Sequence, residues 1–519
     1  MTLQTVDAIF AGAAAESAES VHLVLADGSS WSYAETFARA QRLAALLVES
    51  GIMPGDRVAC FLGNSRPLYE FFIATCLAGA VAVPVNTLNT ARENGILFED
   101  CGPRGIVAQA AHLAVLPDDI LGEMAICLLA DGQGTAIWRE YEPTLAGVAE
   151  PLSESRSTLE SPALIIYSSG TTGRPKGIVL GHRQLLANAR LTMNVLGYGP
   201  EDRFLTLLPS FHLFGYSFDF LYSGLVRGCL VTLPAFDADE ALEMIERHRI
   251  TVLAGVPTMF VTMFEASRRA GRDISSLRLI DVGGGPVPTT LIRELKGLGI
   301  DTVESYGLTE ITTVASVSLP GVMAPEGSCG PVLEGIEVRI CDDHDQPVPV
   351  GQPGELQFRY EGFMLGYWRQ PELTAATLKD GWLRTGDVGR LDEDGNLYIL
   401  DRIKDMIVSN GYNVFPKEVE LVLHEHPEVQ QAAVVGLSHE VRGEDVHAFV
   451  VRRPESRVAA DEILDWCNRN LARFKVPRGI DFVSEMPLTA SGKIRRFVLR
   501  DQAREGRGSS VPSPESGEG

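Results

Sequence analysis

The sequence has no long uninterrupted hydrophobic run. Its longest apolar stretch, from Phe71 to Val85, contains Thr75, Gly79 and Pro84, and it falls short of the ~20 residues that a transmembrane helix needs. We therefore expect no transmembrane segment, and predict instead a buried helix that ends near Gly79 and a strand after it. The N-terminus also lacks the basic segment of a secretory signal. A cytoplasmic location is the expectation that follows.

Cysteine is sparse and is not spaced for a metal or disulfide site. The 519 residues include eight cysteines and no C-x-x-C pair. This pattern indicates neither a zinc knuckle nor a disulfide framework. Buried, reduced cysteines in a reducing compartment are the expected state.

Basic residues are outnumbered by acidic ones. The chain has 45 Lys and Arg against 68 Asp and Glu, which gives a formal net charge of −23. Because nucleic-acid binding needs basic patches, we expect no nucleic-acid partner. A small anionic ligand in a locally basic pocket stays compatible with this charge. The 45% hydrophobic content excludes a mostly disordered chain.

Short β-rich runs alternate with helical patterns from about residue 20 to 400, which favours an α/β fold with much parallel sheet. A helix is predicted over 237–249 with Asp237 as its N-cap. A hairpin is predicted over 381–400 around Asp394 and Gly395. A smaller βα, ββ and α pattern follows residue 403. The β-rich runs are 163–168, 203–209, 229–234, 250–257 and 277–283.

The strongest local signal is YSSGTTGRPKG, from Tyr167 to Gly177. Small residues let backbone N–H groups approach phosphate oxygens, and hydroxyls and a lysine add donors and charge. The spacing is not that of a Walker loop, because Pro175 stands where that motif needs Gly and Gly177 where it needs Ser or Thr. The predicted phosphate-binding residues are Ser168, Ser169, Gly170, Thr171, Thr172, Gly173 and Lys176.

This loop resembles the phosphate loop of the adenylate-forming superfamily, which includes acyl-CoA synthetases, peptide-synthetase adenylation domains and firefly luciferase. Five further motifs match that superfamily in order and spacing, so the resemblance covers residues 20–500. It is closest to the fatty-acid and aryl-acid CoA ligases. The further motifs are LPSFHLFG (208–215), ESYGLTE (304–310), GWLRTGDVG (381–389), DRIKDMIVSNGYNVFPKEVE (401–420) and PLTASGKIRR (487–496).

The resemblance implies a particular domain organisation within the α/β fold class. A large N-terminal domain with several sheets would span residues 1–400 and hold the ATP and acyl sites. A smaller, mobile α+β domain over 405–500 would carry the catalytic lysine and the CoA loop, after a hinge at 401–404. The tail 501–519, rich in Gly, Ser, Pro and Glu, is predicted to be disordered.

The resemblance also assigns nucleotide-binding roles, with ATP, Mg²⁺ and CoA as cofactor and co-substrates. Tyr306 would stack on adenine, and Asp387 and Arg402 would bind the ribose. Thr309 would donate to the α-phosphate, and Thr172 and Glu310 would hold Mg²⁺. The remaining predicted nucleotide-site residues are Gly283, Gly284, Glu304, Ser305 and Gly307.

Catalytic roles fall on residues that would be unremarkable by themselves. By resemblance, Lys493 neutralises charge that develops at the α-phosphate during adenylation. His212 gates the approach of the acid, and Thr309 and Glu310 complete the catalytic set. Lys404 lies at the hinge, and Asn410 and Gly411 lie nearest the CoA pantetheine.

The expected acyl pocket is apolar, with a wall that includes Phe211, Phe214, Tyr216, Val256 and Met259. The motif 211–214 lacks the aspartate that pairs the substrate amine in peptide-synthetase domains. Because a buried ammonium without a partner is unfavourable, an α-amino acid substrate is disfavoured. A fatty or aryl acid is expected.

Asp281 departs from the family pattern, because plant coumarate-CoA ligases carry a lysine at this position near the acyl pocket. A carboxylate there would suit a substrate with a hydroxyl or a cation. It could equally point away from the pocket, and the sequence favours neither arrangement.

The leading function is an ATP-dependent carboxylic acid–CoA ligase, a member of the acid–thiol ligases, that proceeds through an acyl-AMP. The alternatives are an enzyme that loads a separate acyl carrier protein, and a catalytically silent nucleotide-binding homologue. CoA is favoured, because the long insertion of fatty acyl-AMP ligases is absent. Luciferase-like oxidation has no specific support. A monomer and a homodimer are both compatible with the sequence.

Overall fold

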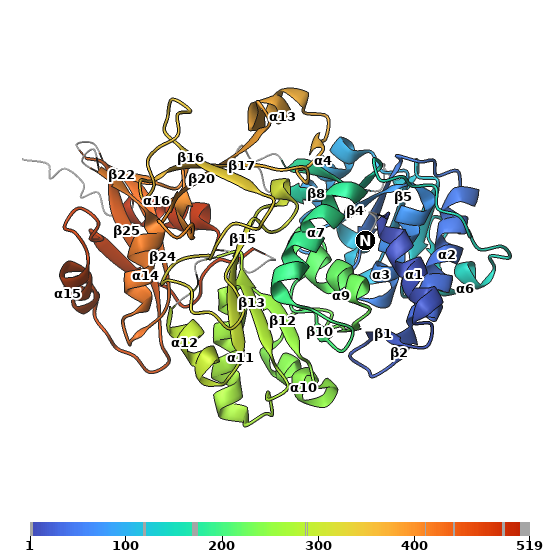
Figure 1. The fold of residues 1–519 in the computed structure, drawn as a ribbon, viewed down its shortest axis with the longest axis horizontal. Coiled ribbons are helices and arrows are strands. Elements are labelled where there is room, and N and C mark those ends of the chain that lie inside the picture. Colours follow the sequence, from blue (N-terminus) through green and yellow to red (C-terminus); the bar gives the residue numbers. More distant parts are fainter. Residues whose placement is uncertain are drawn as a thin grey trace, which may run out of the picture. The chain divides into compact units, whose positions relative to one another are not determined.

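Two structural units divide the chain in the computed structural model (Figure 1). Unit 1 comprises Met1–Gly284, Glu294–Val338 and Gln357–Arg384, and unit 2 comprises Gly285–Arg293, Arg339–Leu356 and Thr385–Gly519. The mixed α/β fold with a large multi-sheet part and a separate C-terminal part is confirmed. The structure describes residues 4–117, 121–168, 175–285, 287, 289–409, 412–439, 442–489 and 494–508.

One eight-stranded sheet of unit 1 is built mainly from parallel strands near the N-terminus. Its two antiparallel pairs both involve β9. In spatial order the strands are β18 (Gly366–Tyr367), β9 (Lys176–Gly181), β8 (Pro162–Ser168), β4 (Val81–Pro84), β3 (Arg57–Phe61), β5 (Gly105–Ala108), β6 (Ile126–Leu129) and β7 (Arg139–Glu140).

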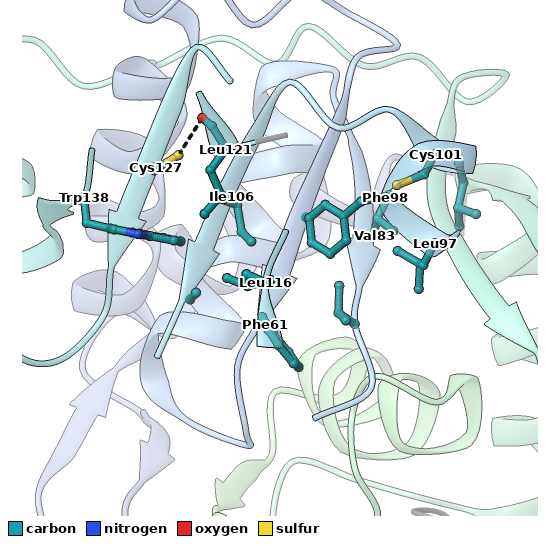
Figure 2. Packing of buried hydrophobic residues seen from close by; sticks show 14 of the residues in the cluster. Phe61, Val83, Leu97, Phe98, Cys101, Ile106, Leu116, Leu121, Cys127 and Trp138 are labelled. Atoms are coloured by element: carbon teal, nitrogen blue, oxygen red, sulfur yellow. Dashed lines mark hydrogen bonds between the residues drawn. The ribbon is translucent and has the colours of Figure 1, made fainter. Parts of the chain in front are cut away.

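A dense hydrophobic cluster packs against this sheet. Figure 2 shows Phe61 and Ile106, from neighbouring strands, among the buried side chains that surround Phe98 and Leu116. Parallel strands buried on both faces read as continuous apolar runs, which is why these segments are visible in the sequence. The cluster fixes the strand β8 that leads into the glycine-rich loop through its member Ile165.

Helices around this sheet begin and end where the local sequence predicts. The apolar run after Arg66 forms α3 (Arg66–Ala78), which ends at Gly79 with φ 73°; glycine adopts this left-handed conformation without strain. The strand β4 follows, as predicted. The other helices of this region are α1 (Val6–Glu16), α2 (Tyr33–Glu49), α4 (Ala91–Cys101), η1 (Ala110–Val115), α6 (Tyr141–Ala146) and α7 (His182–Leu196).

The second eight-stranded sheet of unit 1 contains two neighbouring strands that end at predicted nucleotide-site residues. One strand ends at Gly283 and the other ends at Tyr306, next to Gly307. Its central strands are parallel, and antiparallel pairs occur only at its two ends among the described residues. Each of the β-rich runs predicted at 203–209, 229–234, 250–257 and 277–283 forms a strand of it. In spatial order the strands are β15 (Ser316–Val317), β14 (Asp301–Tyr306), β13 (Leu279–Gly283), β12 (Val252–Gly255), β10 (Arg203–Leu205), β11 (Cys229–Val231), β1 (Val21–Val24) and β2 (Ser30–Ser32).

The predicted helix over 237–249 is confirmed as α10 (Ala238–His248). The side chain of Asp237 accepts hydrogen bonds from the backbone N–H groups of Asp239 and Glu240, which is how an N-cap satisfies the first turn of a helix. The other helical segments of this part of the chain are α8 (Leu213–Gly215), η2 (Tyr216–Tyr222), α9 (Ser223–Val226), α11 (Pro257–Ala270), α12 (Thr289–Gly297) and η3 (Thr309–Ile311), and α13 (Pro371–Thr377) contacts β18 of the first sheet.

A five-stranded sheet contains the predicted hairpin. Strands β20 (Trp382–Leu391) and β21 (Leu397–Arg402) pair antiparallel, and Gly395 in the turn has φ 82°. The hairpin prediction around Asp394 and Gly395 is therefore confirmed. The other strands are β16 (Glu337–Cys341), β17 (Gly354–Arg359) and β19 (Leu378–Lys379).

The C-terminal part of unit 2 has its own sheet, core and helices. The helices are α14 (Pro416–His424), α15 (Ala460–Asn470) and α16 (Arg496–Gly508). The side chain of Arg496 donates to both oxygens of the buried Glu420 at 2.7 and 2.8 Å, which fixes α16 to α14. In spatial order the strands are β23 (Tyr412–Val414), β22 (Ile407–Ser409), β25 (Gly443–Arg452) and β24 (Val429–His439), and β26 (Gly479–Phe482) pairs with β25.

Part of the predicted disordered tail is helical instead. Residues 501–508 continue α16, so the prediction of a tail from residue 501 is wrong for this stretch. Leu499 and Ala503 are buried in a cluster with strands β24 and β25. This tertiary burial stabilises a helix that the local composition does not favour.

The cysteines lie in the interior of the fold. All eight cysteines are buried and free, as expected. Within the described ranges, no helix combines the length and the apolar character that crossing a membrane requires.

Candidate functional site

The β8–β9 hairpin positions the two ends of the glycine-rich loop. Ser168 is the last residue of β8, and it lies opposite Lys176, the first residue of β9. Residues 163–166 of this strand are buried, so the loop starts from a fixed base. The other predicted phosphate-loop residues, Ser169, Gly170, Thr171, Thr172 and Gly173, lie outside the described residues.

Tyr367 joins two residues that the sequence predicts for phosphate and metal binding. The Lys176 ammonium lies 5.6 Å from the centroid of the Tyr367 ring, within the range of a cation–π contact. The Tyr367 hydroxyl donates to Oε1 of Glu310 at 2.9 Å. A cation and a carboxylate from distant segments therefore meet at one aromatic side chain.

Tyr367 lies outside every motif from which the site was predicted. It lies in the two-residue strand β18, which pairs with β9, and nothing in its immediate sequence marks it as functional. Its role is visible only because the pairing of β18 with β9 brings it beside Lys176.

The segment after β14 has a fixed and unusual backbone. A Cβ atom at Gly307 would lie 1.6 Å from the carbonyl oxygen of Thr313, so only glycine fits there. Thr312 and Thr313 have φ values of 66° and 115°, which are rare for β-branched residues. The Thr312 hydroxyl donates to the carbonyl of Gly362, and the Thr313 and Ser217 hydroxyls are 2.7 Å apart. These bonds hold the strained turn that follows Thr309 and Glu310.

The other residues of the ESYG motif are anchored at the end of β14. The backbone N–H of Glu304 donates to the Ser318 hydroxyl at 2.8 Å. The Tyr306 ring lies 6.2 Å from the Phe358 ring, centroid to centroid. Stacking of Tyr306 on adenine stays a prediction.

The glycine run after β13 lies against two predicted site residues. A Cβ atom at Gly283 would be 2.6 Å from Oγ of Ser305 and 3.3 Å from the Phe214 ring. Gly284 has φ 78°, a conformation that favours glycine. The close approach of Phe214 brings the FHLFG motif to the predicted nucleotide residues Gly283 and Ser305.

Tyr216, Val256 and Met259 are the remaining residues of the predicted acyl wall, and all three are buried. The Tyr216 ring packs edge-on against Phe72 at 4.9 Å and tilted against Phe220 at 5.2 Å. Val256 and Met259 are buried at the start of α11. Their side chains are apolar or aromatic, as the predicted pocket requires.

His212 stands immediately before α8, at its N-cap position. Its ring is 4.9 Å from the Phe211 ring, and its side chain is half-buried. The position is thus partly open, and the gating role stays a prediction.

Asp387 and Arg402 form an ion pair in unit 2. They lie opposite each other in the β20–β21 hairpin, and Arg402 Nε is 3.0 Å from Asp387 Oδ1. Asp387 is buried, whereas Arg402 is half-exposed. The two predicted ribose-binding residues are therefore brought together.

The predicted hinge contains a buried carboxylate that the sequence analysis did not single out. Asp401 accepts hydrogen bonds from the backbone N–H groups of Arg402 at 2.8 Å and Lys417 at 3.0 Å. Burial raises the pKa of Asp401 to about 6, although Arg496 opposes the rise. These bonds attach the start of the hinge to the first turn of α14.

Lys404 lies in the turn after β21 with an exposed side chain. Partial desolvation and, after it, the positive charge of Arg402 lower the pKa of Lys404. Asn410, Gly411 and Lys493 lie outside the described residues. The catalytic lysine and the CoA loop therefore stay predictions.

The described residues can offer Mg²⁺ a single carboxylate ligand, and not a complete set of protein ligands. Among them, no group of three or more His, Cys, Asp and Glu side chains is arranged to hold a metal. Mg²⁺ bound with nucleotides takes most of its ligands from phosphates and water and needs only one or two carboxylates. Glu310, oriented by Tyr367, fits that single-carboxylate role.

Comparisons with known proteins find matches to both parts of the chain. The model of the AMP-binding enzymes matches residues 10–368, and that of the AMP-binding enzyme C-terminal domain matches residues 418–493. The chain is 35% identical to a feruloyl-CoA synthase of an Amycolatopsis species, over 91% of this chain and 94% of that protein. It is 33% identical to a fatty acid–[acyl-carrier-protein] ligase of Streptomyces coeruleorubidus, over 92% and 93%.

A solved structure covers nearly the whole chain. The anthranilate CoA ligase AuaEII, solved in complex with anthranoyl-AMP, superposes with a TM-score of 0.91 and is 29% identical, over 98% of this chain and 99% of that one. The likeness therefore extends through both the N-terminal and the C-terminal parts of the chain.

Proposed function

The chain belongs to the family of AMP-binding enzymes, and we propose that it joins an apolar carboxylic acid without an α-amino group to CoA. It is an acid–thiol ligase of the AMP-forming type. The acid's carboxylate attacks the α-phosphate of ATP, and pyrophosphate leaves. The CoA sulfur then attacks the acyl carbonyl of the acyl-AMP, and AMP leaves as the thiol gives up its proton.

The main support for the proposed nucleotide site is that Tyr367 contacts both Lys176 and Glu310. Lys176 supplies positive charge at the base of the phosphate loop, where it would offset the charge of the phosphates. Glu310 would supply one carboxylate ligand for Mg²⁺, and the bound ion would offset negative charge on the phosphates. Tyr367 orients the carboxylate by its hydrogen bond, and Thr309 would donate to the α-phosphate.

We propose further roles for other residues of the nucleotide site and the hinge. Asp387 would accept the ribose hydroxyls, with Arg402 holding its carboxylate in place. Tyr306 and the glycines at 283–284 would border the adenine. Lys493 would assist adenylation, and the segment 401–404 would be the hinge between domains 1–400 and 405–500. A cytoplasmic location is part of the proposal, because free buried cysteines suit a reducing compartment.

The acyl acceptor distinguishes two candidate functions. CoA is favoured, because several relatives are named as CoA ligases. Transfer to an acyl carrier protein is the second candidate, because one relative of almost equal identity is named for it. The two functions share the adenylation step and differ only in the attacking thiol.

The test is ATP-dependent pyrophosphate release across a panel of fatty, aryl and amino acids, with CoA, with a carrier protein that bears a free thiol, or with neither. We expect release with an apolar acid and acyl-CoA formation with CoA. Activity on free amino acids above that on every fatty and aryl acid would contradict the proposed substrate class. Acyl transfer to carrier protein without acyl-CoA formation would establish the second candidate.

A further inference from the structure

A buried asparagine in α7 binds the turn that follows Thr309 and Glu310. The side chain of Asn188 is fully buried, with an exposed fraction of 0%. Its Nδ2 donates to the carbonyl of Val314 at 2.7 Å, and its Oδ1 accepts from the backbone N–H of the same residue at 3.2 Å. One side chain therefore pairs with both polar backbone groups of Val314, as a neighbouring strand would. The same Nδ2 lies 3.4 Å from the carbonyl oxygen of Ile311.

The segment between β17 and β18 binds the same turn. The Tyr360 hydroxyl donates to the carbonyl of Ile311 at 2.5 Å and accepts from Asn188 Nδ2 at 3.2 Å. The backbone N–H of Met364 donates to the carbonyl of Glu310 at 2.9 Å. The turn is therefore bonded to two parts of the chain that are distant in sequence, and Asn188 and Tyr360 meet at it.

The ends of the turn are fixed by the pairing of β14 with β15. Tyr306 lies opposite Ser316 in this antiparallel pair, and the backbone N–H of Ala315 donates to the carbonyl of Tyr306 at 2.8 Å. Thr309 and Glu310 belong to η3, between these two ends. Their place relative to β14 therefore depends on the conformation of residues 311–314, to which Asn188 is bonded.

That conformation needs external support. Thr312 and Thr313 have positive φ values, which β-branched residues rarely adopt. Such backbone persists only where the surrounding structure over-determines it. The bonds of Asn188 to Ile311 and Val314 enclose the two threonines, and they supply support from a rigid helix.

Helix α7 also connects the turn to the phosphate loop. The helix begins at His182, directly after β9, so Lys176 and Asn188 belong to one continuous strand and helix. Strand β9 is itself fixed by its pairing with β8 and β18. The position of Glu310 relative to Lys176 is thus set through α7 and Asn188, in addition to the contact of both residues with Tyr367.

We infer that Asn188 is a positioning residue for adenylation, which holds the turn 311–314 and thereby keeps Thr309 and Glu310 in place relative to Lys176. The inference rests on the proposed function and adds to it a residue outside all the motifs of the predicted site. Loss of the amide would leave the backbone N–H and carbonyl of Val314 unpaired in the interior, which favours a rearranged turn. A displacement of catalytic groups by ~1 Å can slow a reaction ~100-fold.

The experiment measures the two half-reactions separately in the wild type and in Asn188→Ala. Adenylation is followed as pyrophosphate release from Mg-ATP with an active acid, and thioester formation is followed from synthetic acyl-AMP and CoA. Asn188→Ala should slow adenylation by ~10- to 100-fold. It should slow thioester formation much less, because no pyrophosphate leaves in that step. A general loss of folded protein would lower both rates by the same factor.

Asn94→Ala is the matched control. Asn94 is an equally buried asparagine in α4, and its Nδ2 donates to the carbonyl of Val115 at 3.0 Å. Its loss therefore also leaves a buried backbone group unpaired, but this group is not part of the predicted site. Asn94→Ala should lose stability without changing the ratio of the two half-reaction rates.

Two readouts do not depend on turnover. Calorimetric titration with ATP, in Mg²⁺ and in EDTA, gives the gain in ATP affinity that Mg²⁺ provides. Asn188→Ala should lose most of this gain, and Asn94→Ala should keep it. In the protein without ligands, hydrogen–deuterium exchange over residues 307–317 should become ~10-fold faster or more in Asn188→Ala, and it should stay at the wild-type rate in the control.

Tyr360→Phe keeps the inference testable if Asn188→Ala does not fold. This variant removes the hydroxyl that lies between Asn188 and the carbonyl of Ile311, and it leaves the aromatic ring in place. It should slow adenylation several-fold more than thioester formation.

The outcomes separate this inference from the proposed function. If the wild type releases no pyrophosphate with any acid, the proposed function fails, and the inference fails with it. If the wild type is active but Asn188→Ala slows neither half-reaction, or slows both equally, the proposed function stands and the inference is overturned. An unchanged gain from Mg²⁺ in Asn188→Ala also overturns it. If Asn188→Ala does not fold, an unchanged ratio of the two rates in Tyr360→Phe overturns it.

Discussion

Replacing Asp281 by Asn should stabilise the protein at alkaline pH. Burial raises the pKa of Asp281 from 3.8 to about 7, and the nearby Ser305 only partly opposes the rise. The other groups that face Asp281 are the phenols of Tyr198 and Tyr222. Between the two pKa values the unfolded chain binds fewer protons at this site than the folded chain, so stability falls as pH rises.

The size of the effect follows from the shift. A pKa difference of this size corresponds to about 4 kcal/mol, lost progressively between the unfolded pKa and about pH 7. Asn cannot ionise, so Asp281→Asn should be more stable than the wild type by up to about that amount at pH 8. The advantage should shrink toward pH 5 and vanish near pH 4.

The assay is thermal unfolding of both proteins across this pH range. Asp202→Asn is the control of opposite sign, because the ion pair of Asp202 with Arg278 holds its pKa below the usual value despite burial, and the variant should lose stability at neutral pH. If Asp281→Asn is less stable than the wild type at pH 8, or if its effect does not depend on pH, the reasoning about this carboxylate is refuted.

Three further predictions concern the nucleotide site, the two half-reactions and the C-terminal core. Tyr367→Phe removes a hydrogen bond to a carboxylate, worth about 1.5–3 kcal/mol, and should raise KM for ATP or lower kcat ~10- to 100-fold in pyrophosphate release; an unchanged enzyme would contradict its orienting role. Lys493→Ala should slow adenylation by ~100- to 1,000-fold and leave thioester formation from synthetic acyl-AMP unchanged. Lys404→Pro, which restricts the hinge, should slow thioester formation and leave adenylation unchanged. Equal slowing of both steps in Lys493→Ala would refute separate roles. Arg496→Met leaves Glu420 buried without its ion-pair partner. It should lower the free energy of unfolding, measured with denaturant, by about 3–5 kcal/mol. A change below about 1 kcal/mol would show that the pair is not structurally important.

Local signals in the sequence were sufficient for much of the fold. The cap at Asp237 and the turn at Gly395 depend on contacts within a few residues, and both are observed. The strand over 163–168 is recognisable because it is buried and continuously apolar. Helix α16 was cut short in the prediction, because Ala503 is held by packing against distant strands rather than by local propensity.

The candidate site was predicted only in part, because some of its contacts join residues that are far apart in the sequence. Glu310 and Lys176 were identified from their motifs, but Tyr367, which connects them, carries no local signal. The orientation of Asp281 stayed undecided in the sequence, because it depends on Tyr198 and other side chains far along the chain. Long-range side-chain contacts of this kind become visible only once the sheets are formed.

The most direct test of the central claim is the product analysis of one complete turnover. The enzyme, Mg-ATP, CoA and an active acid are mixed, and nucleotides and thioester are quantified together. The account predicts AMP, pyrophosphate and acyl-CoA in equal amounts, with acyl-AMP accumulating when CoA is omitted. Stoichiometric ADP and phosphate, with no acyl-AMP in the absence of CoA, would contradict it.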